Sequence, residues 1–185
     1  METDEEVYLR YRISDDDADL ETLLIRHRER LLLFLLGFVR NVEDAEELLM
    51  DAFARLAVDK PRFENRHDGS FKSWLYTIAR RNALMLIRKR KYETVPMDEN
   101  IPAEDDVPEV VLLKEERNRK LYQAMSALKP EYRRVLYLLY IEGLSHDEIA
   151  RIMGMRKQQI YHLVNRGKES LRKKLEEEGI YDAEY

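Results

Sequence analysis

The sequence predicts an all-α protein with two small helical domains, joined by a proline-rich acidic linker, and with a helix-turn-helix in the C-terminal domain. Apolar residues recur at three- and four-residue spacings along most of the 185 residues, and no segment alternates as a strand would. Three prolines and nine acids interrupt this pattern between residues 93 and 116. In the C-terminal half, a helix-capping pattern and a turn glycine follow each other at the spacing of a helix-turn-helix.

The composition limits the classes of function open to the chain. Cysteine is absent, which excludes disulfides, thiolate zinc sites and cysteine nucleophiles and agrees with a cytoplasmic location. The longest apolar run, residues 31–39, is far shorter than the roughly 20 residues of a membrane span, so no membrane insertion is expected. The acidic first residues do not resemble a secretory signal. Scattered histidines and the lack of a glycine-rich phosphate loop predict no metal, no cofactor and no enzymatic activity.

Basic residues are concentrated in two segments of an otherwise acidic chain. The formal net charge is −5, yet residues 71–92 carry +7 without any acid, and residues 149–175 carry +7 with a single glutamate. The rest of the chain is therefore strongly acidic. Two separate basic helices on an acidic body indicate a polyanion that is held at two places.

The N-terminal half contains three predicted helices. An acidic start at residues 15–17 opens the first helix, which continues to residue 39. The second covers residues 41–58, where Asn41 can cap the N-terminus and four early acids suit the helix dipole. The third covers residues 71–92 and begins at Gly69 or Ser70, after a polar stretch that ends the preceding helical region.

The helix predicted over residues 71–92 has several distinct faces. Its expected core face holds Phe71, Leu75, Ile78, Met85 and Leu86. A second stripe contains Trp74, Thr77, Arg81 and Arg88, and a third contains Tyr76 and Arg80. Aromatic rings among arginines can stack on unpaired bases while the cations hold a single-stranded backbone. Two interpretations of Trp74 stay open, a core residue or a base platform, and Asn82 either satisfies nearby backbone or faces a ligand.

An acidic tether is predicted after this helix. Pro96, Pro102 and Pro108 forbid a continuous helix between residues 93 and 116, and like charge keeps the segment extended. A second helical block follows over about residues 110–178, with breaks at Pro130, at residues 143–145 and at Gly154.

The second block has the pattern of a helix-turn-helix. Ser145 and Glu148 form an S-x-x-E capping box, Gly154 makes the turn, and the small Ala150 permits close helix crossing. In the following helix the expected core face holds Ile160, Leu163, Val164, Gly167 and Leu171. The opposite face carries amides, aromatics and cations, which can pair with base edges and phosphates in a DNA groove. A solvated face of an ordinary helical hairpin is the alternative.

Four motifs, taken in order, resemble the extracytoplasmic-function (ECF, group 4) sigma factors of the bacterial sigma-70 family. They are residues 41–53 (NVEDAEELLMDAF), Arg62-Phe63, residues 71–80 (FKSWLYTIAR) and residues 143–150 (GLSHDEIA). The resemblance extends over about residues 5–175. It implies a factor without catalysis of its own that binds core RNA polymerase and directs promoter-specific transcription initiation at −10 and −35 elements. The implied parts are a region 2 domain (1–95), a flexible acidic linker (96–113), a region 4 domain (114–178) and an acidic tail (179–185).

The resemblance also implies three sets of contact residues. The set expected to dock on the β′ clamp helices of the polymerase is Asp44, Glu47, Met50, Asp51 and Arg55. The set expected to recognise and melt the −10 element is Phe63, Lys72, Trp74, Tyr76, Arg80, Arg81, Asn82 and Arg88. The set expected to read the −35 element is Arg156, Lys157, Gln158, Gln159, Tyr161, His162, Asn165, Arg166 and Lys168. The expected partners are core RNA polymerase, through β′ and β, promoter DNA and an anti-sigma factor, and the free chain is expected to be a monomer.

The sequence departs from the family pattern at three places. Met50-Asp51 stands where the docking helix usually has Gln-Glu, Arg81 precedes Asn82 where Ile-Ala-Arg-Asn is usual, and residues 160–163 (IYHL) replace Val-x-Ser-Arg. The last change implies an unusual −35 sequence or weaker reliance on it. Two alternatives also stay open: a two-domain DNA-binding regulator that acts without polymerase, and an anti-sigma-controlled adaptor that has lost initiation activity.

Overall fold

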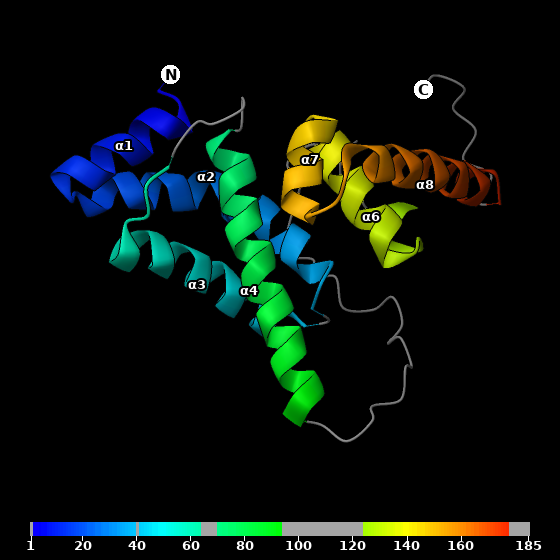
Figure 1. The fold of residues 1–185 in the computed structure, drawn as a ribbon, viewed down its shortest axis with the longest axis horizontal. Helices are drawn as coiled ribbons and strands as arrows, with labels where there is room; N and C mark the ends of the chain where they lie inside the picture. Colours follow the sequence, from blue (N-terminus) through cyan, green and yellow to red (C-terminus); the bar gives the residue numbers. More distant parts are fainter. Residues whose placement is uncertain (1, 40, 64–69, 94–123, 178–185) are drawn as a thin grey trace.

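The structure is a computed structural model, which describes residues 2–39, 41–63, 70–93 and 124–177. Within these ranges every regular element is helical, so the predicted all-α class is confirmed. Helices α1 to α4 form one bundle, and α6, α7 and α8 form a second group beside it (Figure 1). None of the described helices is both long and apolar enough to cross a membrane.

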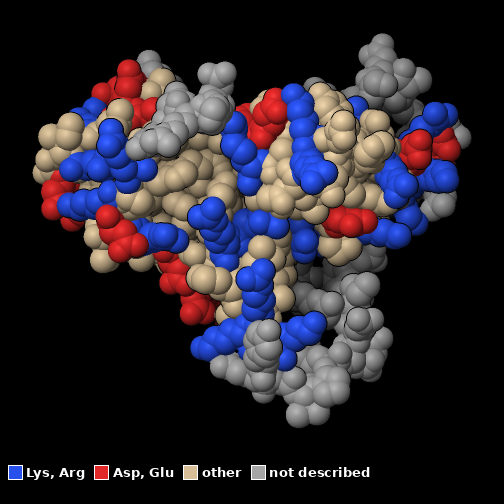
Figure 2. Space-filling view, viewed as in Figure 1, with Lys and Arg blue, Asp and Glu red and all other residues tan. Residues whose placement is uncertain are grey.

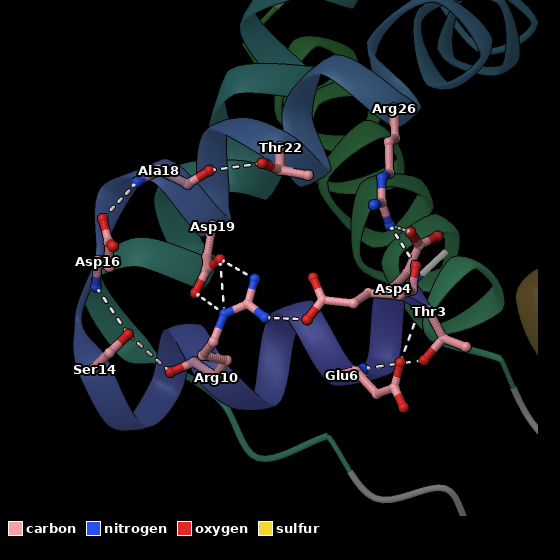
Figure 3. Close-up of polar contacts among 11 residues, drawn as sticks. Thr3, Asp4, Glu6, Arg10, Ser14, Asp16, Ala18, Asp19, Thr22 and Arg26 are labelled. Carbon is pink, nitrogen blue, oxygen red and sulfur yellow. Dashed lines mark hydrogen bonds and ion pairs between the residues drawn. The ribbon is translucent and has the colours of Figure 1, made fainter.

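Helix α1 (Asp4–Ser14) was not predicted from the apolar spacing. Its start is a capping box, in which the hydroxyl of Thr3 accepts from Glu6 N–H at 3.2 Å and the Glu6 carboxylate accepts from Thr3 N–H at 2.9 Å. Polar contacts hold α1 on α2 (Asp17–Leu36), as Figure 3 shows. Arg10 donates to both oxygens of Asp19 at 2.6 to 3.1 Å, and Asp4 accepts from Arg26 at 2.8 Å. The T-x-x-E pattern was therefore the signal in the sequence for this helix.

Helix α3 (Val42–Asp59) begins as predicted. Its cap is Asn41, whose side-chain oxygen accepts a hydrogen bond from Asp44 N–H at 2.7 Å. Helix α2 begins within one residue of the predicted acidic start, after the cap Asp16, but it ends at Leu36 rather than at residue 39. The starts of α2 and α3 thus follow from local side-chain hydrogen bonds that satisfy exposed backbone N–H groups.

Helix α4 (Phe71–Glu93) begins after Ser70, whose hydroxyl accepts from Ser73 N–H at 3.2 Å. The core face is confirmed for its first half, where Phe71, Leu75 and Ile78 are buried. The prediction for Met85 is wrong, because its side chain is 60% exposed. Figure 1 gives the reason: the second half of α4 extends beyond the rest of the bundle.

The C-terminal group has the predicted helix-turn-helix. Helix α6 (Pro130–Leu136) runs into a short π-helical turn, η1 (Tyr137–Ile141), and is followed by α7 (His146–Met153) and α8 (Lys157–Glu177). The capping box of α7 is confirmed, since Ser145 and Glu148 exchange both bonds, at 3.3 and 3.0 Å. Gly154 makes the turn with a φ of 61°, a left-handed conformation that favours glycine.

The two groups pack against each other. The backbone carbonyl of Gly37 accepts from Arg134 Nε at 2.7 Å, and the guanidinium of Arg134 lies 4.0 Å from the centre of the Phe38 ring. Burial lowers the pKa of Arg134 to about 10, ahead of repulsion from other arginines. The hydroxyl of Tyr137 donates to the carbonyl of Arg30 at 2.7 Å. The predicted acidic linker and tail lie outside the described residues, so the domain boundaries stay a prediction.

Candidate nucleic-acid and polymerase interfaces

The outer face of α8 is open to solvent in the packed arrangement. All nine residues predicted to read DNA are exposed: Arg156, Lys157, Gln158, Gln159, Tyr161, His162, Asn165, Arg166 and Lys168. The expected core residues Ile160, Val164 and Leu171 are buried on the other side, and Leu163 is partly buried. Figure 2 shows lysine and arginine side chains gathered over α4 and around α7 and α8. This geometry suits a helix that enters a groove of an anionic duplex.

Several side chains on this face have partners of their own. The side-chain oxygen of Gln159 accepts from the backbone N–H of Arg156 at 2.8 Å, so this amide caps the start of α8. The ammonium of Lys168 lies 5.7 Å from the centre of the Tyr140 ring. Gln159 and Lys168 are therefore less available to DNA than the sequence indicates. Gln158, His162 and Asn165 are exposed polar side chains within the same face.

The residues predicted to contact the −10 element are only partly accessible. Arg81 and Arg88 are exposed, whereas Lys72, Trp74, Arg80 and Asn82 are half-buried. Tyr76 is fully buried, and Phe63 is 8% exposed. Neither aromatic ring can contact DNA in this arrangement.

An aromatic cluster explains the burial of Phe63 and the position of Trp74. The Trp74 ring centre lies 5.3 Å from that of Tyr8, 5.4 Å from that of Phe63 and 5.7 Å from that of Phe71. Burial raises the pKa of Tyr8 to about 12. Of the two interpretations of Trp74, this cluster favours the core residue, because three aromatic rings surround its indole.

Helix α7 and the turns on either side of it cover one side of α4. Ser70 Oγ donates to Glu148 Oε1 at 2.7 Å, and Lys72 Nζ lies 3.3 Å from the Glu142 carboxylate. Burial opposes ionisation of Glu148, but the hydrogen bonds from Ser70 and Ser145 outweigh it and lower its pKa. A side-chain atom placed on Gly154 would lie 3.5 Å from the guanidinium of Arg80. Burial, followed by repulsion from Arg81 and Arg88, lowers the pKa of Arg80.

Tyr76 lies at the centre of this covered side. Its ring centre is 4.9 Å from that of Phe34, and its hydroxyl is fully buried close to Glu142 and Tyr137. Burial and the nearby charge of Glu142 raise the pKa of Tyr76 well above its usual range. The helical periodicity of α4 predicts the buried face against α2 and α3, but it cannot predict that α7 covers a further side.

The outer face of α3 is the third candidate surface. Glu47, Met50, Asp51 and Arg55 are exposed there, and Met50 is 54% exposed. Asp44, predicted to belong to the same set, is 7% exposed and instead accepts from both terminal nitrogens of Arg90 at 2.5 and 2.6 Å. The hydrogen bonds from Arg90 lower the pKa of Asp44. Asp44 therefore fixes α4 to α3 and does not extend outward.

Comparisons with known proteins agree with this geometry. The model for "Sigma-70 region 2" matches residues 23–92, and the model for "Sigma-70, region 4" matches residues 118–171. The chain is 30% identical to the ECF RNA polymerase sigma factor SigW of Bacillus subtilis over 173 residues, which cover 87% of this chain and 90% of that protein. The chain belongs to the ECF sigma factors of the sigma-70 family. It is thus a factor for promoter-specific transcription initiation by RNA polymerase.

Other ECF sigma factors and solved structures extend the comparison. The chain is 30% identical to ECF RNA polymerase sigma factor SigE of Mycolicibacterium smegmatis over 82% of its own length, but it spans only 60% of that longer protein. Two solved structures have the same fold, CnrH in complex with the cytosolic domain of CnrY (TM-score 0.63, 18% identity) and the sigma factor RpoE of Bartonella quintana with the anti-sigma factor NepR (TM-score 0.61, 22% identity). The match to CnrH covers 95% of this chain and 98% of CnrH, and the match to RpoE covers 85% of this chain and 97% of RpoE.

Among residues 2–39, 41–63, 70–93 and 124–177, no group of three histidine, aspartate or glutamate residues is placed to hold a metal ion. The relatives reported above are named as RNA polymerase sigma factors.

Proposed function

We propose that this sigma factor docks on core RNA polymerase through the exposed side of α3, melts the −10 element with α4 and reads the −35 element with α8. The observation that carries the proposal is the outer face of α8. On a capped and glycine-turned helix-turn-helix, nine polar, aromatic or basic side chains lie outside the core. No other helix combines such a face with the packing of a groove reader in the described part of the chain.

The docking surface in this proposal is narrower than the sequence predicted. Glu47, Asp51 and Arg55 follow one another at one-turn intervals on α3, with Met50 beside them as an exposed apolar contact. A charged rim around an apolar anchor fits binding to another protein. Asp44 acts inside the domain, through its ion pair with Arg90.

Lys72 and Arg80, two of the −10 residues, become accessible to DNA only when the domains separate. Ser70, Lys72 and Arg80 all contact the region of α7 in the packed arrangement. The exposed face of α8 needs no such change. Binding to a large polymerase surface would supply the free energy of separation, and it would place two weak DNA contacts on one promoter at high effective concentration.

The remaining partners follow from this role. We propose an anti-sigma factor as a regulatory partner, as in the RpoE–NepR complex, and a monomer as the free form. The protein acts in the cytoplasm, where polymerase and chromosome are located, and it performs no catalysis of its own.

The test is promoter-specific transcription with purified core polymerase. We expect run-off transcripts from a subset of a genomic promoter library, and we expect Asp51→Lys to lose co-purification with the core enzyme. Glu21→Lys makes the same charge change on an exposed position of α2 and serves as the control. Absence of specific transcripts across the library, or full retention of Asp51→Lys on the polymerase, would contradict the proposal and favour a DNA-binding regulator that works alone.

A further inference from the structure

Two neighbouring residues at the start of α7 contact two residues on the reading face of α8. The imidazole of His146 stacks on the ring of Tyr161, with 4.2 Å between ring centres and an angle of 17° between planes. The carboxylate of Asp147 forms an ion pair with Lys157 at 2.7 Å. Lys157 and Tyr161 lie one turn apart on α8, so successive residues of one helix hold successive turns of the other.

The start of α7 is itself held in place. Ser145 and Glu148 form the capping box, and the same Glu148 carboxylate accepts from Ser70 at 2.7 Å when the domains are packed. His146 is half-buried, whereas Tyr161 remains 44% exposed. One face of the tyrosine ring is therefore covered by the imidazole, while much of the side chain stays exposed to a ligand.

We propose that His146 and Asp147 are positioning residues that set the −35 specificity of this sigma factor. The inference deepens the proposed function and rests on it. His146 restricts the Tyr161 ring to one orientation, so that α8 meets the base edges without first ordering this side chain. Asp147 engages the ammonium of Lys157, and its hydrogen bond raises the pKa of that lysine.

The two contacts are expected to act on DNA binding in opposite ways. A lysine free to contact a phosphate adds sequence-independent affinity, so Asp147 lowers non-specific binding by competing for Lys157. An ordered tyrosine adds affinity only where the base edges match, so His146 raises specific binding. Together they increase the ratio of specific to non-specific affinity, which is the quantity that locates a promoter.

The experiment uses the full chain in complex with core polymerase. A preferred −35 sequence is first selected by the wild-type holoenzyme from a library randomised at that element. Affinities for the selected site and for a scrambled site are then measured between about 50 and 200 mM salt, the range over which phosphate contacts change affinity strongly. The variants are His146→Ala, His146→Phe, Asp147→Asn and the control Glu176→Gln, which makes the same charge change beside Arg172 and away from α7.

The expected results separate the two residues. Asp147→Asn should tighten binding to the scrambled site several-fold and steepen the salt slope by about one unit, as one added phosphate contact would. His146→Ala should weaken binding to the selected site about 5- to 10-fold and spare the scrambled site, a loss typical of one aromatic contact. His146→Phe should bind the selected site nearly as tightly as the wild type. In a chain that already carries Tyr161→Ala, adding His146→Ala should not weaken this binding further.

Each contrary outcome has one meaning. If the wild-type holoenzyme selects a −35 sequence but His146→Ala and Asp147→Asn behave like the control, the positioning role is overturned and the proposed function stands. If the wild-type holoenzyme selects no −35 sequence, the proposed reading by α8 fails, and this inference fails with it.

Discussion

Replacing Lys72 with methionine should shift the chain from the packed arrangement toward separated domains. The Lys72 ammonium lies 3.3 Å from the Glu142 carboxylate, and only 1% of the Glu142 side chain is exposed. Without the ammonium, Glu142 keeps only a share of the Tyr137 hydroxyl, which lies 3.1 Å away and also donates to the Arg30 carbonyl at 2.7 Å, and its charge loses the cation at 3.3 Å. In separated domains the same carboxylate would be hydrated, so the substitution costs free energy only in the packed arrangement.

The magnitude follows from the burial of the pair. Removing one partner of a fully buried ion pair costs about 3 to 5 kcal/mol. The Lys72 side chain is 27% exposed, so water can replace part of its contact with Glu142. We therefore expect a cost of about 2 kcal/mol, which raises the ratio of separated to packed molecules about 30-fold.

Spin-label distance measurements on the free chain can detect this shift. The chain contains no cysteine, so Ile25→Cys on α2 and Lys173→Cys on α8 provide two unique labels at exposed positions. The distribution of distances between the two labels should include longer distances in Lys72→Met than in the wild-type chain. Lys72→Met/Arg134→Ala, which also removes the bond to Gly37, should increase that fraction further.

Lys91→Met is the matched control, because it makes the same substitution at an exposed position of α4. If Lys72→Met leaves the distances unchanged, or if Lys91→Met changes them equally, the ion pair with Glu142 does not hold the domains together. The reasoning from the buried carboxylate would then be wrong.

Three further predictions concern stability, each measured by urea unfolding. The hydrogen bond from His27, with help from Arg26, lowers the pKa of Asp4 from 3.8 to about 2. The Asp4 carboxyl binds a proton more readily in the unfolded chain than in the folded one. The free energy of unfolding of the wild type should therefore exceed that of Asp4→Asn by about 2 kcal/mol at pH 6, and this excess should shrink as the pH falls from about 4 to 2. An excess that does not depend on pH would contradict the prediction. Asp44→Ala and Arg90→Ala should each lower the free energy of unfolding by about 1 kcal/mol, and the double variant should lose less than the sum of the two. If the two losses simply add, the pair does not couple α3 to α4. Gly154→Ala should cost about 1 kcal/mol through its left-handed backbone alone, since the added methyl would find room beside Arg80; an unchanged midpoint would refute this.

The elements of the fold were largely predictable because their signals are local. Asn41, Ser145 and Gly154 act on backbone groups within a few residues of themselves, and each has the predicted role. The helix over residues 4–14 has the same kind of signal in Thr3 and Glu6. Its mixture of charges and apolar residues hides the helical periodicity, which explains why it was not predicted.

The candidate site was predictable only where one helix meets solvent. On α8 the polar face and the core face follow from the period of 3.6 residues, and the exposed residues agree with the prediction. On α3 the family resemblance implied that Asp44 faces the polymerase, but Asp44 is buried against Arg90, which comes from another helix. His146 lies within the motif of residues 143–150, but its contact with Tyr161 could not be predicted, because the two rings come from different helices of the helix-turn-helix.

By itself, the sequence determined the helical class, the main helix starts, the two basic segments and the exposed polar face of α8. These depend on side-chain spacing along single helices and on hydrogen bonds between near neighbours. Only the tertiary structure decided that Tyr76 is enclosed, that Lys72 faces Glu142 and that Ser70 bonds Glu148. Whether such a side chain is buried depends on which element, distant in the sequence, packs against its helix. The periodicity of one helix contains no information about that element.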